Sequence, residues 1–271
     1  MTRVLTDKTP IDLHIPSLKQ ALAVFVHGAQ DKYVSRQIRE QGIWEPYETS
    51  LVLKLLGPGS VFVDVGANLG YFSLIAASLV GDTGKVVAFE PDPVNFELLN
   101  ASIDLNHFGA RIQSVEAGLS DQACEGRLYL SEDNMGDHQI YAGEGDRESL
   151  PIALLNGTAF LAPLVSQVDL LKVDTQGSEF QVMAGLMPLL KNQQKPLRII
   201  IELTPFSLTE SGASGRKLIA LLALLDLPFW IIDHIEHQLA ETTAEELAKW
   251  CDNVDASVGD QGFMNILVGD M

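Results

Sequence analysis

The amino-acid sequence predicts an α/β protein with a mainly parallel sheet that is covered by helices on both faces. From residue 60 onward, short apolar segments alternate with segments of helical spacing, and no internal repeat interrupts the alternation. The first apolar segment also runs directly into a glycine-containing turn, VDVGANLG at 63–70, and an apolar helix follows this turn. Strand, glycine turn and helix in this order are typical of nucleotide-binding sheets with a Rossmann-like arrangement.

Seven strands are expected, each of them a short apolar run. They are 60–65, 85–90, 111–119, 168–174, 197–203, 229–234 and 262–269. Helices are expected at 71–80, 94–106, 178–190, 216–225 and 243–250. Asp92 is a predicted N-cap with Pro93 at the first helical position, and Thr243 and Glu246 have the spacing of a capping box. In such a fold, ligands bind at the carboxyl ends of the strands, so residues just after each strand are the first candidates for a site.

Two segments do not follow this alternation. Residues 1–50 are expected to form an N-terminal helical cap, with the clearest helical pattern in DKYVSRQIREQGIW at 31–44. Residues 51–271 are expected to form the main domain. Within it, 122–165 is long and carries five glycines, which favours an inserted hairpin with an active-site loop.

The composition excludes several classes of protein. No apolar run approaches the roughly 20 residues that span a bilayer, and no basic segment followed by an apolar one opens the chain, so neither a membrane partner nor a signal peptide is expected. The net charge of −18 would repel a phosphate backbone, so nucleic acid is not expected as a partner. The two cysteines are far apart and have no metal-ligand spacing, which favours a reduced, cytoplasmic protein.

The glycine turn departs from both phosphate-binding patterns. A dinucleotide fingerprint needs three glycines, but Asn68 and Tyr71 stand where the second and third would follow Gly66. A P-loop needs a lysine followed by serine or threonine, and the turn from 66 to 70 has neither. Both phosphate-binding interpretations are therefore weakened.

Two acidic residues indicate a different ligand. Asp64 lies two positions before the first glycine, where a carboxylate would repel a pyrophosphate but would suit an ammonium and a sulfonium, as in S-adenosylmethionine. Glu90 ends the second strand and is placed to accept hydrogen bonds from both ribose hydroxyls. NAD-binding enzymes use the same acid, so Glu90 indicates a nucleoside without choosing between the two cofactors.

Three sequence blocks together resemble the FkbM family of S-adenosylmethionine-dependent methyltransferases. They are DVGANLGYFS, FEPDPVNFELL and LLKVDTQGSEFQVMAGL, and GIWEPYET upstream resembles a Glu-Pro segment of that family. The resemblance extends from about residue 31 to 203, and Gln176 departs from it where the family often has glutamate. It implies a class I methyltransferase fold, with a seven-stranded sheet whose last strand is antiparallel.

The resemblance also assigns residues to the cofactor, S-adenosyl-L-methionine. The methionine part would be held by Asp64, Gly66, Asn68 and Gly70. The ribose would be held by Glu90, with Pro91 and Asp92 nearby. The adenine would be flanked by Gly118 and Leu119, while Asp174 would lie near the transferred methyl group and Glu45 would fold over the cofactor.

Methyl transfer to an alcohol needs a group that removes the hydroxyl proton. Asp174 is the first candidate base by its position, Glu202 is another acid at a strand end, and His138 is a base or a substrate contact in the irregular loop. Asp174, Glu179 and Glu202 could also supply oxygen ligands to a divalent cation. Because Glu179 starts a helix, whose dipole favours a carboxylate by itself, no catalytic metal is predicted and a divalent cation is kept as an alternative. His234 and His237 are expected to be a surface pair far from the glycine turn.

The resemblance implies O-methylation of a hydroxyl group on a sugar or a natural-product small molecule, with N-methylation also represented in the family. The alternatives are an NAD-dependent oxidoreductase, and a noncatalytic protein that binds S-adenosylmethionine without a productive base. The expected partner is a small hydroxylated acceptor. The sequence leaves the oligomeric state open, a homodimer included.

Overall fold

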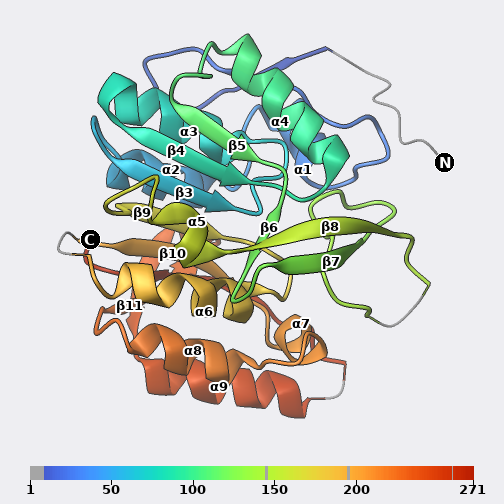
Figure 1. Cartoon of the computed structure of the whole chain (residues 1–271), viewed down its shortest axis with the longest axis vertical. Coiled ribbons are helices and arrows are strands. Elements are labelled where there is room, and N and C mark those ends of the chain that lie inside the picture. Colours follow the sequence, from blue (N-terminus) through green and yellow to red (C-terminus); the bar gives the residue numbers. More distant parts are fainter. Residues whose placement is uncertain (1–8, 144–145, 194–195, 258) are drawn as a thin grey trace.

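The computed structural model describes residues 9–143, 146–193, 196–257 and 259–271 (Figure 1). Its central sheet has eight strands among these residues, in the order β12-β11-β13-β10-β9-β3-β4-β5. The five parallel strands are β3 Val61–Val65, β4 Lys85–Phe89, β5 Ile112–Val115, β9 Leu170–Val173 and β10 Arg198–Leu203. β13 Met264–Val268 pairs antiparallel with β10 and with β11 Phe229–Asp233, and β12 Gln238–Thr242 pairs antiparallel with β11. The predicted α/β fold with a mainly parallel sheet is confirmed, including the antiparallel last strand.

The strands differ from the expected set in two places. An eighth strand, β12, pairs with β11 at the edge of the sheet, and its residues are polar and mostly exposed, so it lacks the apolar run that marks a buried strand. The expected strand at 111–119 is also shorter than predicted. It ends at Val115, and the chain continues into β6 Gly118–Ser120, which belongs to a second sheet.

The second sheet has the strand order β6-β8-β7. Strands β7 Cys124–Tyr129 and β8 Ser149–Asn156 pair antiparallel, while β6 pairs parallel with β8. The segment 122–165 therefore contains a hairpin whose strands are joined by a long connection, residues 130–148. In Figure 1 this hairpin extends from the sheet on the side of β6.

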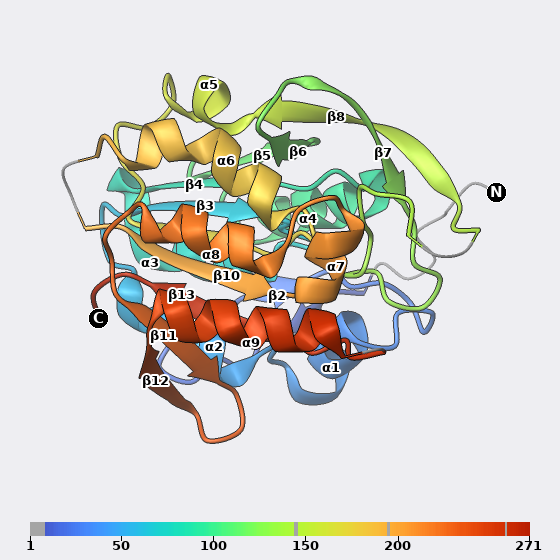
Figure 2. The same ribbon diagram turned by 90° about the horizontal axis from the view of Figure 1, so that it is seen from below.

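Helices cover both faces of the central sheet, because apolar side chains alternate between its two faces along each strand. The first face packs against α1 Val34–Gln41, α2 Pro46–Leu55, α3 Tyr71–Val80 and α4 Pro93–Leu105. The second face packs against α5 Gly157–Leu161, α6 Glu179–Leu190, α8 Gly215–Ala223 and α9 Ala244–Ala256. Figures 1 and 2 show α6, α8 and α9 side by side. The remaining elements are β1 Ile11–Asp12, β2 Ala23–Val24, η1 Gly81–Thr83 and α7 Pro205–Glu210.

The N-terminal segment is helical only from Val34 onward in its described part. Residues 9–33 are otherwise irregular apart from the short pair β1 and β2. The boundary expected at residue 50 falls inside α2, so the division into a cap and a main domain stays a prediction. Within the described ranges, every helix is too short or too polar to cross a membrane.

Candidate functional site

A cavity of about 800 Å³ opens at the carboxyl ends of β3, β4, β9 and β10. The sequence-predicted site residues that line it are Glu45, Asp64, Gly66, Asn68, Glu90, Pro91, Gly118, Leu119, His138, Asp174 and Glu202. Three other predicted residues, Gly70, Asp92 and Glu179, do not line the cavity in the described structure. The connection between β7 and β8 also contributes to the wall, through residues 134–141 among others.

Both glycines of the turn after β3 have a positive φ, and a Cβ atom at either position would meet a neighbouring segment. Gly66 has a φ of +85°, and a Cβ atom at this position would lie 1.9 Å from the carbonyl oxygen of Asp174. Gly70 has a φ of +89°, and a Cβ atom there would lie 2.4 Å from Cδ1 of Leu99. Gly66 therefore lets the ends of β3 and β9 approach each other, whereas Gly70 lets α3 begin close to α4.

Glu90 is buried at the end of β4, and its carboxylate is held by the backbone of two neighbouring turns. Its Oε2 accepts a hydrogen bond from the backbone N–H of Asn68 at 2.7 Å, and its Oε1 accepts one from that of Asp92 at 2.9 Å. Burial raises the pKa of this carboxyl to about 8, against the opposing effect of these hydrogen bonds. Glu90 thus joins the glycine turn to the start of α4, and it also lines the cavity.

Asp92 and His138 form a second buried contact beside this acid. Asp92 caps α4 as predicted, since its side chain accepts from the backbone N–H of Asn95. His138 has both ring nitrogens engaged: Nδ1 accepts from the backbone N–H of Ser131 at 3.0 Å, and Nε2 lies 3.4 Å from Oδ2 of Asp92. This arrangement attaches the connection 130–148 to α4, and it leaves His138 poorly placed to take a proton from an acceptor.

Asp64 points under α3, away from bulk water. Its Oδ2 accepts a hydrogen bond from the hydroxyl of Ser73 at 2.6 Å, and the residue is only 2 % exposed. Burial raises the pKa of Asp64 to about 6, although the nearby Lys172 lowers it. Asp64 therefore lies beneath the glycine turn and is partly protonated near neutral pH.

These two carboxyls predict that the free protein becomes less stable as the pH rises from about 5 to 8. Asp64 and Glu90 keep their protons in the folded chain at pH values where the unfolded chain has lost them, because their folded pKa values are raised. The free energy of unfolding then falls with increasing pH by up to about 1.4 kcal/mol per pH unit for each retained proton. The effect of Asp64 ends above about 6 and that of Glu90 above about 8.

Urea unfolding at pH 5, 6, 7 and 8 measures this dependence. Glu90→Gln is expected to flatten the curve, because it removes one titrating group. Glu97→Gln, a change at an exposed position on α4, is the matched control and should keep the slope of the unmodified protein. Parallel curves for all three proteins would contradict the raised pKa of Glu90.

Four polar side chains lie on the α2–α3 face of the central sheet, where apolar residues would be expected. They are Asp64 on β3, Lys172 on β9, Glu202 on β10 and Asn265 on β13. Asp64 pairs with Lys172 in register, and Glu202 pairs with Asn265. Lys172 lies opposite Ile200, two positions before Glu202, so the two pairs form a staggered row on one face of the sheet. Alternation along each strand places the row on the same face as the apolar cluster that includes Phe72 of α3.

Lys172 lies within this row and is 4 % exposed. Its Nζ is 3.0 Å from Oδ2 of Asp174, 3.5 Å from Oε1 of Glu48, and 4.8 Å from the centre of the Phe72 ring. Burial alone would lower the pKa of Lys172, but Asp174 and Glu48 raise it well above its usual value. Lys172 is therefore a permanent cation among carboxylates.

Asp174 and Glu202 are bridged by one side chain, Gln176. Its Nε2 donates to Oδ1 of Asp174 at 2.8 Å and to Oε2 of Glu202 at 2.9 Å. The backbone of Gln176 is left-handed, with a φ of +53°, which turns the amide toward both acids. Burial, followed by the charges of Asp174 and Glu179, raises the pKa of Glu202 well above its usual value.

Glu179 is near this pair but faces the loop in front of α6. Its Oε1 accepts from the backbone N–H and the hydroxyl of Thr175 at 2.9 and 3.0 Å, and both of its oxygens accept from the N–H of Gly177. These bonds fix the turn between β9 and α6. The three carboxylates Asp174, Glu179 and Glu202 therefore do not converge on one point as metal ligands would.

Sequence reasoning missed Lys172 and Gln176 in the cavity wall, and Asn265 and His234 beside Glu45 of that wall. A signal was available for two of them: Lys172 and Asn265 interrupt strands that are otherwise wholly apolar, and a buried polar residue needs a partner. His234, expected in a surface pair with His237, is half-buried and does not line the cavity in the described structure. Nε2 of His234 lies at a distance of 3.3 Å from Nδ2 of Asn265, beside Glu45 and Glu48.

The chain matches one protein family and is similar to several known proteins. The family described as "Methyltransferase FkbM domain" matches residues 64–229. The chain is 27 % identical over 147 residues to "Methyltransferase 1" of Beauveria bassiana (strain ARSEF 2860), a match that covers 47 % of this chain and 58 % of that protein. It is 25 % identical over 154 residues to methyltransferase sdnD of Sordaria araneosa, covering 46 % and 59 % of the two chains. The matches thus span less than two thirds of the length of these relatives.

Among solved structures, the crystal structure of methyltransferase FkbM from Methylobacillus flagellatus KT is 15 % identical to this chain, with a TM-score of 0.43. That match covers 82 % of this chain and 51 % of the other. The family match extends over more than half of the 271 residues, and the resemblance noted in the sequence is confirmed. The chain belongs to the FkbM domain family of S-adenosylmethionine-dependent methyltransferases.

Proposed function

We propose that this protein transfers a methyl group from S-adenosylmethionine to a hydroxyl group of a small molecule, a sugar or a natural product. The observation that carries the proposal is the excess of carboxyl groups over cationic side chains in the cavity wall. Among its described lining residues are seven carboxyl groups, Glu45, Asp64, Glu90, Asp137, Asp174, Glu202 and Glu210. Only two lysine or arginine side chains, Lys172 and Arg147, are among the same residues. Such a wall favours a ligand that carries a sulfonium and an ammonium.

Both cations of the cavity wall are already paired, which argues against a dinucleotide. Lys172 contacts Asp174 and Glu48, while Arg147 donates to the carboxylate of Asp137 at 2.9 Å. Within the described lining, no lysine or arginine remains to neutralise a pyrophosphate. The NAD-dependent alternative is therefore disfavoured by charge as well as by the missing glycines.

Unpaired hydrogen-bond acceptors in the cavity wall suit S-adenosylmethionine. Asn68 Oδ1 and Thr204 Oγ1 are buried, lie in residues that line the cavity, and form no hydrogen bond within the described structure. Their oxygens can accept hydrogen bonds from an ammonium group. Asp64, Gly66 and Asn68 would hold the methionine part from below, with Gly70 shaping the turn.

The nucleoside part would lie between the ends of β4 and β6. Glu90, with Pro91 and Asp92 beside it, would accept bonds from the ribose, and Gly118 and Leu119 would flank the adenine. Bound there, the cofactor supplies a methyl group that is already activated by its sulfonium. The remaining task of the protein is alignment of the acceptor and removal of its proton.

We assign the proton-accepting role to Glu202, with Asp174 as the residue that positions it through Gln176. Both oxygens of Asp174 already accept hydrogen bonds, from Lys172 and Gln176. Glu202 accepts one bond through Oε2, and no hydrogen bond to its Oε1 is formed within the described residues. The raised pKa of Glu202 suits a general base near neutral pH, because its ionised form accepts a proton more readily than an ordinary carboxylate does.

The acceptor would enter from the side of the connection 130–148. Tyr141 and Gln139 line the cavity from this connection. Phe206 and Phe263 also line it, and they are 39 % and 64 % exposed. Polar groups beside exposed aromatic rings favour a hydroxylated molecule with apolar faces.

Calorimetry and methyl transfer test the proposal. We expect S-adenosylmethionine and its demethylated product to bind with one site per chain, and NAD to show no heat of binding. A labelled methyl donor, incubated with a set of hydroxylated acceptors, should label at least one of them. NAD binding without S-adenosylmethionine binding would refute the proposal, and cofactor binding without transfer to any acceptor would support the noncatalytic alternative.

A further inference from the structure

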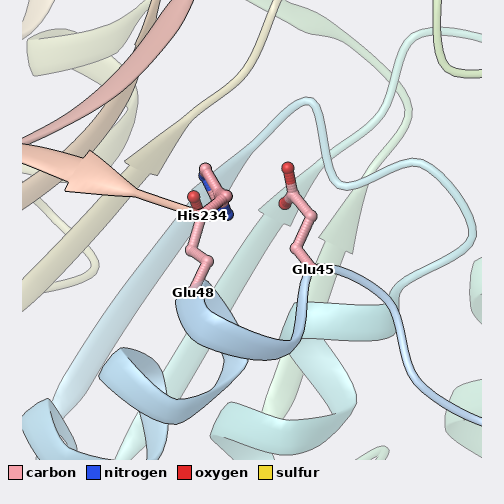
Figure 3. A group of neighbouring side chains, drawn as sticks. All are labelled: Glu45, Glu48 and His234. Carbon is pink, nitrogen blue, oxygen red and sulfur yellow. The ribbon is translucent and has the colours of Figure 1, made fainter. Parts of the chain in front are cut away.

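Three side chains that can bind a metal ion converge beside the polar row of the sheet. One ligand atom each of Glu45, Glu48 and His234 lies within 4.8 Å of the other two (Figure 3). Glu48 is fully buried, while Glu45 and His234 are partly exposed. Figure 3 shows the two glutamates rising from the start of α2 toward His234, which follows β11.

The fold brings these residues together from distant parts of the chain. Glu45 precedes α2 with a left-handed backbone, at a φ of +41°, and Glu48 lies in the first turn of the same helix. His234 comes directly after β11, and Asn265 lies on β13, which pairs with β11. A strained backbone at a cluster of ionisable residues is a common property of ligand sites.

Asn265 places its amide group among the three side chains. Its Nδ2 donates to Oε2 of Glu48 at 2.8 Å, and lies 3.5 Å from Oε1 of Glu45 and 3.3 Å from Nε2 of His234. Asn265 is 7 % exposed, and its Oδ1 is buried without a hydrogen bond in the described structure. A buried polar atom of this kind destabilises the fold unless a ligand satisfies it.

Each of the two glutamates also has a buried oxygen that lacks a hydrogen-bond partner in the described structure. Oε2 of Glu45 and Oε1 of Glu48 are buried and have no hydrogen bond within the described residues. The cation near Glu48 is Lys172, 3.5 Å from Oε1, and Lys172 is shared with Asp174 at 3.0 Å. The cluster thus has acceptor atoms in excess and too little positive charge.

We propose that Glu45, Glu48 and His234 bind one divalent transition-metal cation, of the Mn²⁺ or Zn²⁺ class, with the Asn265 amide as a fourth ligand. Two carboxylates and an imidazole are a mixed oxygen and nitrogen donor set, which these cations accept. Rotation of the Asn265 amide by half a turn exchanges Oδ1 and Nδ2 and brings the unsatisfied oxygen into the cluster. The cation would connect α2, the end of β11 and β13. This site is separate from the acids proposed for proton transfer, and it shares only Glu45 with the described wall of the cofactor cavity.

Metal titration of the whole chain tests the site. The protein is treated with a chelator to remove bound metal, and any histidine tag is cleaved off. It is then titrated with Mn²⁺, and binding is measured as loss of the electron paramagnetic resonance signal of free Mn²⁺. A second titration with Zn²⁺ is measured by calorimetry. We expect one equivalent of either metal to bind. His234→Ala should weaken binding by about 10-fold or more, since it removes a direct ligand.

His237→Ala is the matched control. His237 lies three residues further on and stacks on Tyr47, with ring centroids 5.6 Å apart, and it is no member of the cluster. This variant should bind Mn²⁺ within two-fold of the unmodified protein. Glu48→Gln is the second variant, which keeps the size of the buried side chain and should also weaken binding, while circular dichroism reports whether each variant is folded.

Absence of Mn²⁺ and Zn²⁺ binding to the unmodified protein would overturn the proposal. Equal Mn²⁺ affinity of folded His234→Ala and His237→Ala would overturn it as well, because the metal would then be bound elsewhere. Titration of the stripped protein with S-adenosylmethionine is read separately. The proposed methyltransferase function and the metal site can therefore fail independently.

Discussion

Glu202→Gln is expected to lower kcat by about 10²- to 10⁴-fold, the range of a lost general base. The substitution keeps the size of the side chain, and the new amide can present its oxygen to Nε2 of Gln176, so the bridge to Asp174 survives. Because this bridge is retained, we expect S-adenosylmethionine to bind within a few-fold of its original affinity. Methyl transfer to an acceptor found in the labelling screen, together with calorimetry, measures both quantities.

Asp174→Asn provides the contrast for this experiment. The carboxylate of Asp174 is 3.0 Å from Nζ of Lys172, so its removal leaves a buried ammonium that contacts Glu48 at 3.5 Å. We therefore expect Asp174→Asn to lower the free energy of unfolding as well as the rate, whereas Glu202→Gln lowers the rate alone. The pH dependence of kcat separates the roles of Glu202 and Asp174. Ionisation of the general base makes kcat rise with pH, and this rise should disappear in Glu202→Gln and remain in Asp174→Asn. If Glu202→Gln retains more than a tenth of kcat, Glu202 is not the base.

The parts of the fold that follow from local sequence were predictable. Apolar runs marked the seven strands, and Asp92 and Thr243 cap the helices that their sequences indicated. The glycine turn was also readable, because Gly66 and Gly70 stand at positions with positive φ where other residues are strained. These features depend on neighbours in the sequence, or on periodicity within one element.

The rest depends on contacts between distant segments. His234 joins Glu45 and Glu48 only because β11 pairs with β13 and both lie beside α2, and a single sequence does not give strand order. His138 was a candidate base, but its engagement by Ser131 and Asp92 comes from the folding of the connection 130–148. Edge strand β12 was missed because an exposed edge needs no apolar run.

Gly66→Ala is expected to abolish cofactor binding and to lower the free energy of unfolding by about 3 kcal/mol or more, as severe backbone clashes do. At a φ of +85°, an alanine is strained, and its Cβ would lie 1.9 Å from the carbonyl oxygen of Asp174. The carbonyl cannot easily retreat, because the N–H of Asp174 donates to the carbonyl oxygen of Val65 at 3.0 Å within the sheet. Relief of the clash must separate the ends of β3 and β9, where the methionine part of the cofactor is proposed to bind.

Gly212→Ala separates this clash from the strain of a positive φ. Gly212 has almost the same φ, +86°, but a Cβ atom there would meet no atom within 4 Å. Its replacement should cost about 1–2 kcal/mol, the strain of a left-handed residue alone, and should leave S-adenosylmethionine binding unchanged. Urea unfolding and calorimetry on both variants measure the difference. Equal effects of the two substitutions would mean that conformational strain accounts for the requirement at Gly66, and that the approach of β3 to β9 contributes nothing further.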